Sequence, residues 1–391
     1  MSKISVLSSS DFPYGGAPEN FVREMVQGIA NILIEEDIEV VLFWGQRNCF
    51  YNDTKINCTN YLLNKPIRNE FLKFFELALQ IFIIPAFVFK TKFYKKNEML
   101  VLYGLDRFYI VSPIVIFCKI FKLKCVRVIT EIYRTEDYTY YWWRKPLYFF
   151  NKIQLMYFDK YLDGIVVLSS YLMNYCLKNG VNKKNIFFVP HFINFNNKIS
   201  NNVTNSNSSF NIVYSGTITY ENGITDLIDA YIQFFKVNAH NCSLTIMGKK
   251  NPNIYNTLDE IELEKFNIEF TGNLQRDKMF SILHNANLLV NPRRKSILAE
   301  SGFPTKLGEY FSTKVPVLTT SVGDINIYFK NGHELYLSPP NDPKELSKML
   351  NYIYNQLDER IEVGKNGYKW GKDNLDNVSN AKKMLDFFNI K

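Results

Sequence analysis

Two side chains near residue 306 are suited to bind a ligand that carries both negative charge and hydroxyl groups. Lys306 and Glu309 lie three residues apart in a predicted helix start and therefore share one helical face. Pro304 and Thr305 favour a helix start, because proline loses no hydrogen bond there and threonine can cap. The free N–H groups and dipole of such a start bind anions. These groups suit the diphosphate and hydroxyls of a nucleotide-sugar, while an ordinary capped helix with a surface Lys–Glu pair is the open alternative.

The helix start belongs to a long alternation of predicted strands and helices. Apolar runs predict strands at 4–8, 38–44, 99–103, 125–130, 164–168 and 186–189, and then at 212–214, 243–247, 268–270, 288–290 and 315–320. Helical spacing predicts helices at 22–33, 110–121, 146–158, 170–178, 225–235, 343–356 and 381–390. Residues 194–211 are rich in Asn and Ser and predict a linker. With 391 residues, the chain is predicted to form two α/β domains, each with a doubly wound parallel sheet.

Composition narrows the class of protein and of partner. A hydrophobic content of 47% with 21% charged residues describes a folded protein, and the net charge of +8 favours anionic partners without choosing among them. The six cysteines show no CxxC spacing, which predicts reduced, buried thiols in a cytosolic protein. The N-terminal strand does not resemble a signal peptide, and the longest apolar run, 81–89, is too short to span a bilayer.

Residues 66–97 mix aromatic side chains with lysines and leave two interpretations open. A very apolar helix is followed by a basic, aromatic stretch at 87–96. This pattern fits contact with an anionic bilayer surface or with a lipid-linked substrate. It equally fits a core helix followed by a solvated basic loop.

The unusual loops of this chain all follow predicted strand ends. Doubly wound sheets bind ligands at the carboxyl ends of their strands, so two such domains predict a binding cleft between them. The loops in question contain Gly15-Gly16, Glu131, Gly216, Gly248-Lys249, Gly272 and residues 293–306. Their convergence favours a ligand site over an isolated capped helix.

Several of these segments together resemble the retaining glycosyltransferases of family four, which have the GT-B fold. The segments are 14–19, 163–169, 189–193, 214–218, 246–249, 291–293 and, as the most specific, 302–310. The resemblance implies two Rossmann-like doubly wound domains facing each other across a cleft. Residues 1–195 would be the acceptor-binding domain, 196–210 the linker, 211–370 the donor-binding domain, and 371–391 a terminal helix packing back on the first domain.

The resemblance also implies roles for individual residues. Glu309 would bind the ribose hydroxyls, Lys306 and the amides of Leu307 and Gly308 would hold the diphosphate, and Gly16 would lie beneath the phosphates. The loop from Gly272 through Asn273 to Leu274 would meet the base. Glu131, Lys306 and Glu309 are the expected catalytic residues. The expected donor-binding set comprises Gly16, Gly216, Thr217, Lys249, Gly272, Asn273, Leu274, Arg293, Ser301, Gly302, Phe303, Pro304, Thr305, Lys306, Leu307, Gly308 and Glu309.

Four positions depart from the family pattern. Ser301 stands where the first of two glutamates is usual, with Glu300 one place off, and Thr217 and Asn222 replace an arginine and a lysine that stabilise the leaving diphosphate. Glu131 stands where many members have a histidine. Lys306, Lys249 or Arg293 would then have to supply the missing charge, or activity is impaired.

The resemblance therefore implies a retaining glycosyltransferase of the hexosyltransferase type, acting in bacterial surface polysaccharide (lipopolysaccharide or capsule) synthesis. It would move a sugar from a nucleotide-diphosphate sugar to a saccharide or lipid-linked acceptor, without metal or other cofactor, since no DxD sequence occurs. A catalytically weak nucleotide-sugar-binding partner subunit and a sugar-nucleotide epimerase are the alternatives. We expect a cytoplasmic location, with or without peripheral contact to the anionic inner face of the membrane, and no nucleic-acid partner.

Overall fold

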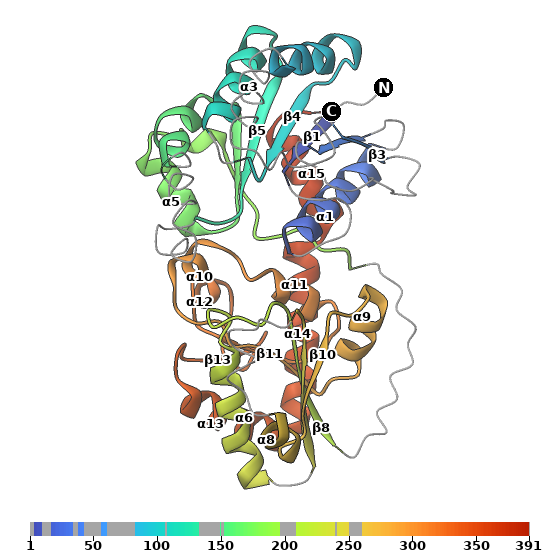
Figure 1. The fold of residues 1–391 in the computed structure, drawn as a ribbon, viewed down its shortest axis with the longest axis vertical. Coiled ribbons are helices and arrows are strands. Elements are labelled where there is room, and N and C mark those ends of the chain that lie inside the picture. The colour runs from blue at the N-terminus through green and yellow to red at the C-terminus, as the bar shows by residue number, and fades with distance from the viewer. Residues whose placement is uncertain are drawn as a thin grey trace. The chain divides into compact units, whose positions relative to one another are not determined.

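The computed structural model describes residues 4–9, 17–33, 38–42, 56–60, 83–105, 108–132, 149, 152–195, 209–238, 241–249 and 260–390. The chain divides into two compact units. Unit 1 comprises Met1–Asn194 and Asp376–Lys391, and unit 2 comprises Phe195–Leu375. Figure 1 shows that each unit contains a sheet flanked by helices.

Unit 1 is built on a seven-stranded parallel sheet with the order β3-β2-β1-β4-β5-β6-β7. Its strands are β1 (Ile4–Ser8), β2 (Ile38–Leu42), β3 (Ile56–Asn60), β4 (Met99–Tyr103), β5 (Lys124–Ile129), β6 (Gly164–Val167) and β7 (Ile186–Phe188). Its helices include α1 (Ala17–Ile32), α3 (Phe108–Ile120), α5 (Ser170–Lys178) and α15 (Asn377–Phe387). Strands β1 and β4 are buried along their whole length, which explains their continuous apolar sequences.

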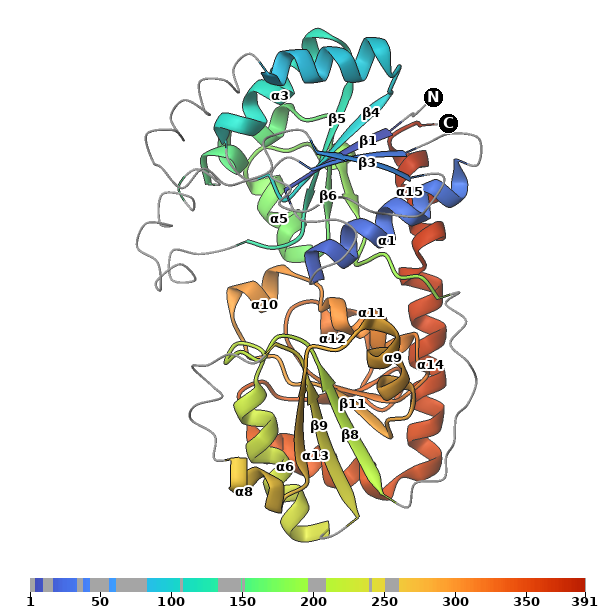
Figure 2. The same ribbon diagram turned by 45° about the vertical axis from the view of Figure 1, so that its right-hand side comes forward.

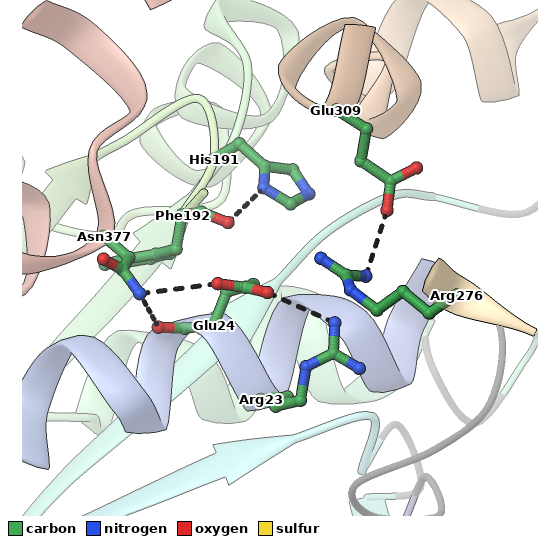
Figure 3. Close-up of polar contacts among 7 residues, drawn as sticks. All are labelled: Arg23, Glu24, His191, Phe192, Arg276, Glu309 and Asn377. Atoms are coloured by element: carbon green, nitrogen blue, oxygen red, sulfur yellow. Dashed lines mark hydrogen bonds and ion pairs between the residues drawn. The ribbon is translucent and has the colours of Figure 1, made fainter. Parts of the chain in front are cut away.

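The terminal helix α15 packs on α1, so a segment from the end of the chain completes unit 1 (Figure 2). The Asn377 side-chain amide donates to the main-chain oxygen of Glu24 over 3.2 Å, and its backbone N–H donates to Ile193 O over 2.9 Å. Arg23 in turn pairs with Glu24, as Figure 3 shows. These buried polar contacts fix the register of the terminal helix against the first one.

Unit 2 has a six-stranded sheet with the order β10-β9-β8-β11-β12-β13, again parallel. Its strands are β8 (Phe210–Ser215), β9 (Cys242–Met247), β10 (Ile268–Gly272), β11 (Leu288–Asn291), β12 (Val317–Thr320) and β13 (Tyr336–Ser338). Its helices are α6 (Ile224–Asn238), α8 (Glu260–Lys265), α9 (Arg276–His284), α10 (Ile297–Ser301), α11 (Thr305–Phe311), α12 (Ile325–Tyr328), α13 (Pro343–Asn355) and α14 (Leu357–Leu375). The predicted fold class, two doubly wound α/β domains, is confirmed.

Some elements have no clear signal in the sequence. Strand β3 reads INCTN and has no apolar run, so it escapes a prediction based on hydrophobic pattern. Helix α14 escapes it because three of the five buried residues on its face are glycines, Gly364, Gly367 and Gly371, between Val363 and Leu375. At Gly364 a Cβ would lie 2.2 Å from Lys314 O, so glycine is required for this close backbone approach.

One expectation about the cysteines is wrong. Cys58 is disulfide-bonded. Cys118, Cys125, Cys176 and Cys242 are free and buried, as expected. Spacing along the sequence does not reveal which thiols the fold brings together.

In the described part of the chain, no helix has the length and apolar character needed to cross a bilayer.

Candidate functional site

Helix α11 lies at the carboxyl end of the unit 2 sheet and is held there by a buried tyrosine. The Tyr310 hydroxyl accepts a hydrogen bond from Ser215 N over 2.8 Å, at the last residue of β8. Leu307, Tyr310 and Phe311 are all buried, as their helical spacing predicts. The N-cap residue is Pro304 and no side chain caps the helix. The expectation that Thr305 caps is therefore wrong, because Thr305 is already the first helical residue.

Lys306 does not extend into solvent but folds over the end of β8. Its Nζ donates to Tyr214 Oη over 2.5 Å and lies 4.3 Å from the centre of the Tyr214 ring. Tyr214 Oη donates onward to Thr217 O over 2.9 Å. A Cβ at residue 216 would lie 2.1 Å from Lys306 Cε, so the end of the lysine would have to shift if residue 216 carried a side chain. Gly216 also has a φ of +147°, which residues other than glycine rarely adopt.

The surroundings of Lys306 make its charge sensitive to pH. Burial, assisted by the nearby Arg293 guanidinium and partly offset by Glu309, lowers the pKa of Lys306 to about 7. Near neutral pH the amine is therefore close to half protonated in the absence of a ligand. An anion bound beside it would favour the protonated form.

Glu309 forms an ion pair with Arg276, a residue that the sequence did not single out. Arg276 Nη1 lies 3.5 Å from Glu309 Oε1, as Figure 3 shows, and its guanidinium lies 4.8 Å from the centre of the Phe280 ring. Arg276 is the first residue of α9, directly after the loop that begins at Gly272. A basic residue following a strand-end loop is a signal that could have found it. The pair joins α11 to the loop expected to meet a base.

Backbone hydrogen bonds hold three neighbouring strand ends together beneath this helix. Gly216 N donates to Met247 O over 2.8 Å, and Gly248 N donates to Gly272 O over 3.0 Å. A Cβ at residue 248 would lie 1.8 Å from Gly216 O, so the tight approach requires glycine. The ends of β8, β9 and β10 are thereby brought into one cluster, with Lys249 exposed at its edge.

Thr217 and Asn222, where the sequence resemblance implies an arginine and a lysine, are joined by a hydrogen bond within a turn. Asn222 Nδ2 donates to Thr217 O over 2.8 Å. Among the neighbouring cations, Arg294 is engaged in two contacts with Asp226 and lies 3.9 Å from the Tyr220 ring centre. Those contacts give Arg294 a structural role.

Arg293, by contrast, lies beside Lys306. Its Nη2 donates to Leu298 O over 3.1 Å, which turns the guanidinium toward α10. Its charge contributes to lowering the Lys306 pKa, so the two cations share one local field. Arg293 and Lys306 are therefore two positive groups that lie close together at α11.

The short helix α10 contains Ser301, which stands where the resemblance implies a glutamate, and the neighbouring Glu300. Ser301 is fully buried, whereas Glu300 Oε2 accepts from Gly323 N over 3.2 Å. Gly302, Phe303 and Pro304 are also buried. Ser301 therefore contributes to packing at the root of the loop, and Glu300 is engaged by the loop after β12.

Two other predicted site residues, Glu131 and Gly16, belong to unit 1. Glu131 follows β5 and is partly exposed, and its role stays a prediction. Gly16 lies outside the described residues. His191 is buried, its Nδ1 lies 2.8 Å from Phe192 O, and burial lowers its pKa to about 4, so its imidazole is neutral (Figure 3). In the described part of the chain, no cluster of three His, Cys, Asp or Glu residues could hold a metal.

Most of unit 2 matches a known protein family. Residues 209–356 match the family model described as glycosyl transferases group 1. An uncharacterized glycosyltransferase of Methanocaldococcus jannaschii is 25% identical over 227 residues, which are 57% of this chain and 59% of that protein. The matching region thus spans about three fifths of the relative's length.

Solved structures match over almost the full chain. Anabaena HepE in complex with UDP superposes with a TM-score of 0.73 at 14% identity, covering 99% of both chains. WaaG, a glycosyltransferase involved in lipopolysaccharide biosynthesis, superposes with a TM-score of 0.68 at 15% identity, covering 98% of this chain and 99% of that one. At these identities the likeness concerns the fold, which is GT-B, as the sequence resemblance predicted.

Proposed function

We propose that this chain, whose residues 209–356 match the family model described as glycosyl transferases group 1, transfers a sugar from a nucleotide-diphosphate sugar to a saccharide or lipid-linked acceptor. The observation that carries the proposal is the position of Lys306. Its amine lies over the carboxyl end of β8, beside the glycine-shaped strand ends and near Arg293 and Glu309. Such an arrangement suits an anionic diphosphate next to a hydroxyl-rich ribose.

Different residues of unit 2 bind different parts of the donor. Lys306 and Arg293 supply positive charge to the diphosphate, together with the amides of Leu307 and Gly308. Glu309, oriented by Arg276, accepts the ribose hydroxyls. The loop from Gly272 to Leu274 contacts the base, and Lys249 and Thr217 line the edge of the same cluster.

Chemistry follows from stabilising the leaving group. As the bond from the sugar to the diphosphate breaks, negative charge grows on the diphosphate and is met by preorganised cations and amides. This requires no metal from the chain. The configuration at the sugar carbon is retained, with the departing phosphate accepting the proton of the acceptor hydroxyl.

The similar proteins suggest which donors and pathways to try first. Anabaena HepE binds UDP and UDP-glucose, and WaaG is involved in lipopolysaccharide biosynthesis. These similarities support UDP-hexoses as the first donors to test, and we propose cell-surface polysaccharide synthesis as the process.

A second candidate is supported by a specific observation. Asn222 donates to Thr217 O and neither side chain carries a charge, so two cations usual in the family are absent. A nucleotide-sugar-binding subunit that depends on a catalytic partner would tolerate this loss. Turnover of a donor by the purified chain alone excludes it.

The test is a thermal-shift screen of nucleotide-sugars followed by turnover assays, because a ligand that binds only the native state raises the unfolding temperature. Lys306→Ala and Glu309→Ala should each weaken binding of the best donor about ten- to hundredfold, the value of a lost charge-assisted hydrogen bond. Lys348→Ala, an exposed lysine of the same unit paired with Glu345, is the matched control and should leave affinity unchanged. Equal affinity of the Lys306 and control variants would refute the proposal.

A further inference from the structure

Unit 1 exposes a continuous apolar surface formed by two adjacent helices. Residues 83–94 form a helix whose last turn, Lys90–Tyr94, is π-helical, and it lies beside α3. We call the following set the aromatic patch: Phe89, Phe93, Tyr94, Ile116, Ile120 and Phe121. The exposed fractions reach 51% at Phe93, 76% at Tyr94 and 60% at Ile120. Both helices lie near the α3 label in Figures 1 and 2.

Ring contacts join the two helices into one surface. The Phe121 ring centre, just past α3, lies 5.5 Å from that of Phe89 and 5.7 Å from that of Phe93. Phe89 and Phe93 lie 4.7 Å apart, one helical turn from each other. A hollow of about 540 Å³ opens between the helices and is lined by Pro85, Ala86, Phe89, Lys90, Tyr94 and Phe121. Clustered exposed apolar side chains of this kind mark an interaction surface rather than random exposure.

The charge around the aromatic patch is predominantly positive, with the exposed Glu98 following its first segment. Neither residues 83–97 nor residues 108–124 contain an aspartate or a glutamate, although they contain seven lysines. Lys95 pairs with Glu39 and Lys119 pairs with Asp163. Lys124 donates to Phe388 O over 2.8 Å.

The other four lysines, Lys90, Lys92, Lys96 and Lys122, have no ion pair within the described residues. They therefore leave an uncompensated positive charge beside the exposed rings. An anionic partner would be attracted to this surface, and a cationic one repelled.

The aromatic patch cannot turn inward, because the opposite face of its helix is already packed. Ile84, Phe87, Val88 and Thr91 are buried beneath it. At the end of the helix, Asn97 Nδ2 donates to Ser5 Oγ over 2.6 Å, and Ser5 Oγ donates to Glu39 Oε2 over 3.0 Å. This buried network ties the helix to β1 and β2, so the exposed rings are a fixed feature of unit 1.

We propose that the aromatic patch binds the surface of an anionic phospholipid bilayer. Aromatic rings suit the headgroup region, while lysines beside them extend to the phosphates, as in interfacial helices. The excess of lysines over acidic residues in and next to these segments matches an anionic surface better than a protein surface of mixed charge. The proposal concerns unit 1 only and does not depend on the transferase activity.

The experiment is co-sedimentation of the full chain with vesicles of phosphatidylcholine alone or of phosphatidylcholine with phosphatidylglycerol. The wild-type chain should bind the anionic vesicles and lose affinity as salt is raised. Lys90→Gln with Lys92→Gln should weaken binding about 25-fold, about fivefold per lysine. Phe93→Ser should weaken it about tenfold, because a partly exposed ring no longer enters the headgroup layer.

Matched variants of unit 2 provide the controls. Lys369→Gln with Lys372→Gln removes two exposed lysines, and Val237→Ser removes an exposed apolar side chain, 74% exposed in the wild type. Both should bind vesicles as the wild type does. Unfolding temperatures of all variants verify that the chain is folded.

Three results would overturn the proposal. One is equal binding to neutral and anionic vesicles, and another is no binding to either. The third is a dimer in light scattering that Phe93→Ser converts to a monomer without any vesicle binding, which would assign the aromatic patch to a second copy of the chain.

Discussion

The charge of Lys306 should make donor affinity fall as pH rises. Its pKa is about 7 in the unliganded protein, so the amine is about nine-tenths protonated near pH 6 and about one-tenth protonated near pH 8. A bound diphosphate requires the protonated form, so the ligand must recruit a proton above pH 7. The dissociation constant should therefore rise about tenfold between about pH 6 and pH 8 and about tenfold more by pH 9.

The same lysine should affect stability with the opposite sign. The pKa is lowered in the folded protein from an ordinary value of 10.5 to about 7, so the unfolded chain binds more protons between these values. The free energy of unfolding of the unliganded protein should therefore rise with pH across this window. Rising stability and falling donor affinity over one pH range are a distinctive combination.

The assay is calorimetric titration of the best nucleotide-sugar, with unfolding temperatures measured without ligand at each pH. Lys306→Met keeps much of the side-chain volume over the Tyr214 ring and removes the titrating group. It should bind more weakly, with an affinity independent of pH, and should lose the rise in stability. A wild-type affinity that stays constant between about pH 6 and pH 8 would refute the reasoning, as would the same slope in the methionine variant.

Two further predictions concern Arg276, which orients Glu309, and Tyr310, which holds helix α11 against β8. Arg276→Ala should weaken donor binding about fivefold, because a partly exposed ion pair orients its carboxylate partner for about 1 kcal/mol; Lys278→Ala, an exposed change on the same helix, should have no effect in the same titration. Tyr310→Phe should lower the free energy of unfolding by about 1–3 kcal/mol in urea titrations, because it removes the partner of the buried Ser215 N–H. Tyr231→Phe, whose hydroxyl makes only a 3.7 Å contact with sulfur, should cost less, and equal losses would contradict the assigned role of Tyr310.

The alternation of apolar strands and amphipathic helices predicted the fold class, because parallel strands buried on both faces read as continuous apolar runs. β1 and β4 are examples. The elements that escaped prediction lack this signal for physical reasons. β3 is a polar strand, and the buried face of α14 consists largely of glycines, of which Gly364 and Gly367 allow close backbone contact.

For residues 66–97, the sequence left contact with an anionic bilayer or a lipid-linked substrate, and a core helix followed by a solvated basic loop, equally open. Residues 66–82 lie outside the described residues. In residues 83–94 one face of the helix is buried and the other exposes Phe89, Phe93 and Tyr94, so bilayer contact stays a proposal.

The sequence by itself determined that Lys306 and Glu309 lie on one helix that begins after a strand, because local spacing and turn residues suffice for that. Only the tertiary structure decided what surrounds them. Tyr214, about 90 residues earlier, accepts the hydrogen bond from the lysine, burial lowers the pKa of its amine, and Arg276 engages the glutamate. Burial is the main cause of the lowered pKa, and it results from packing between segments that only folding brings together.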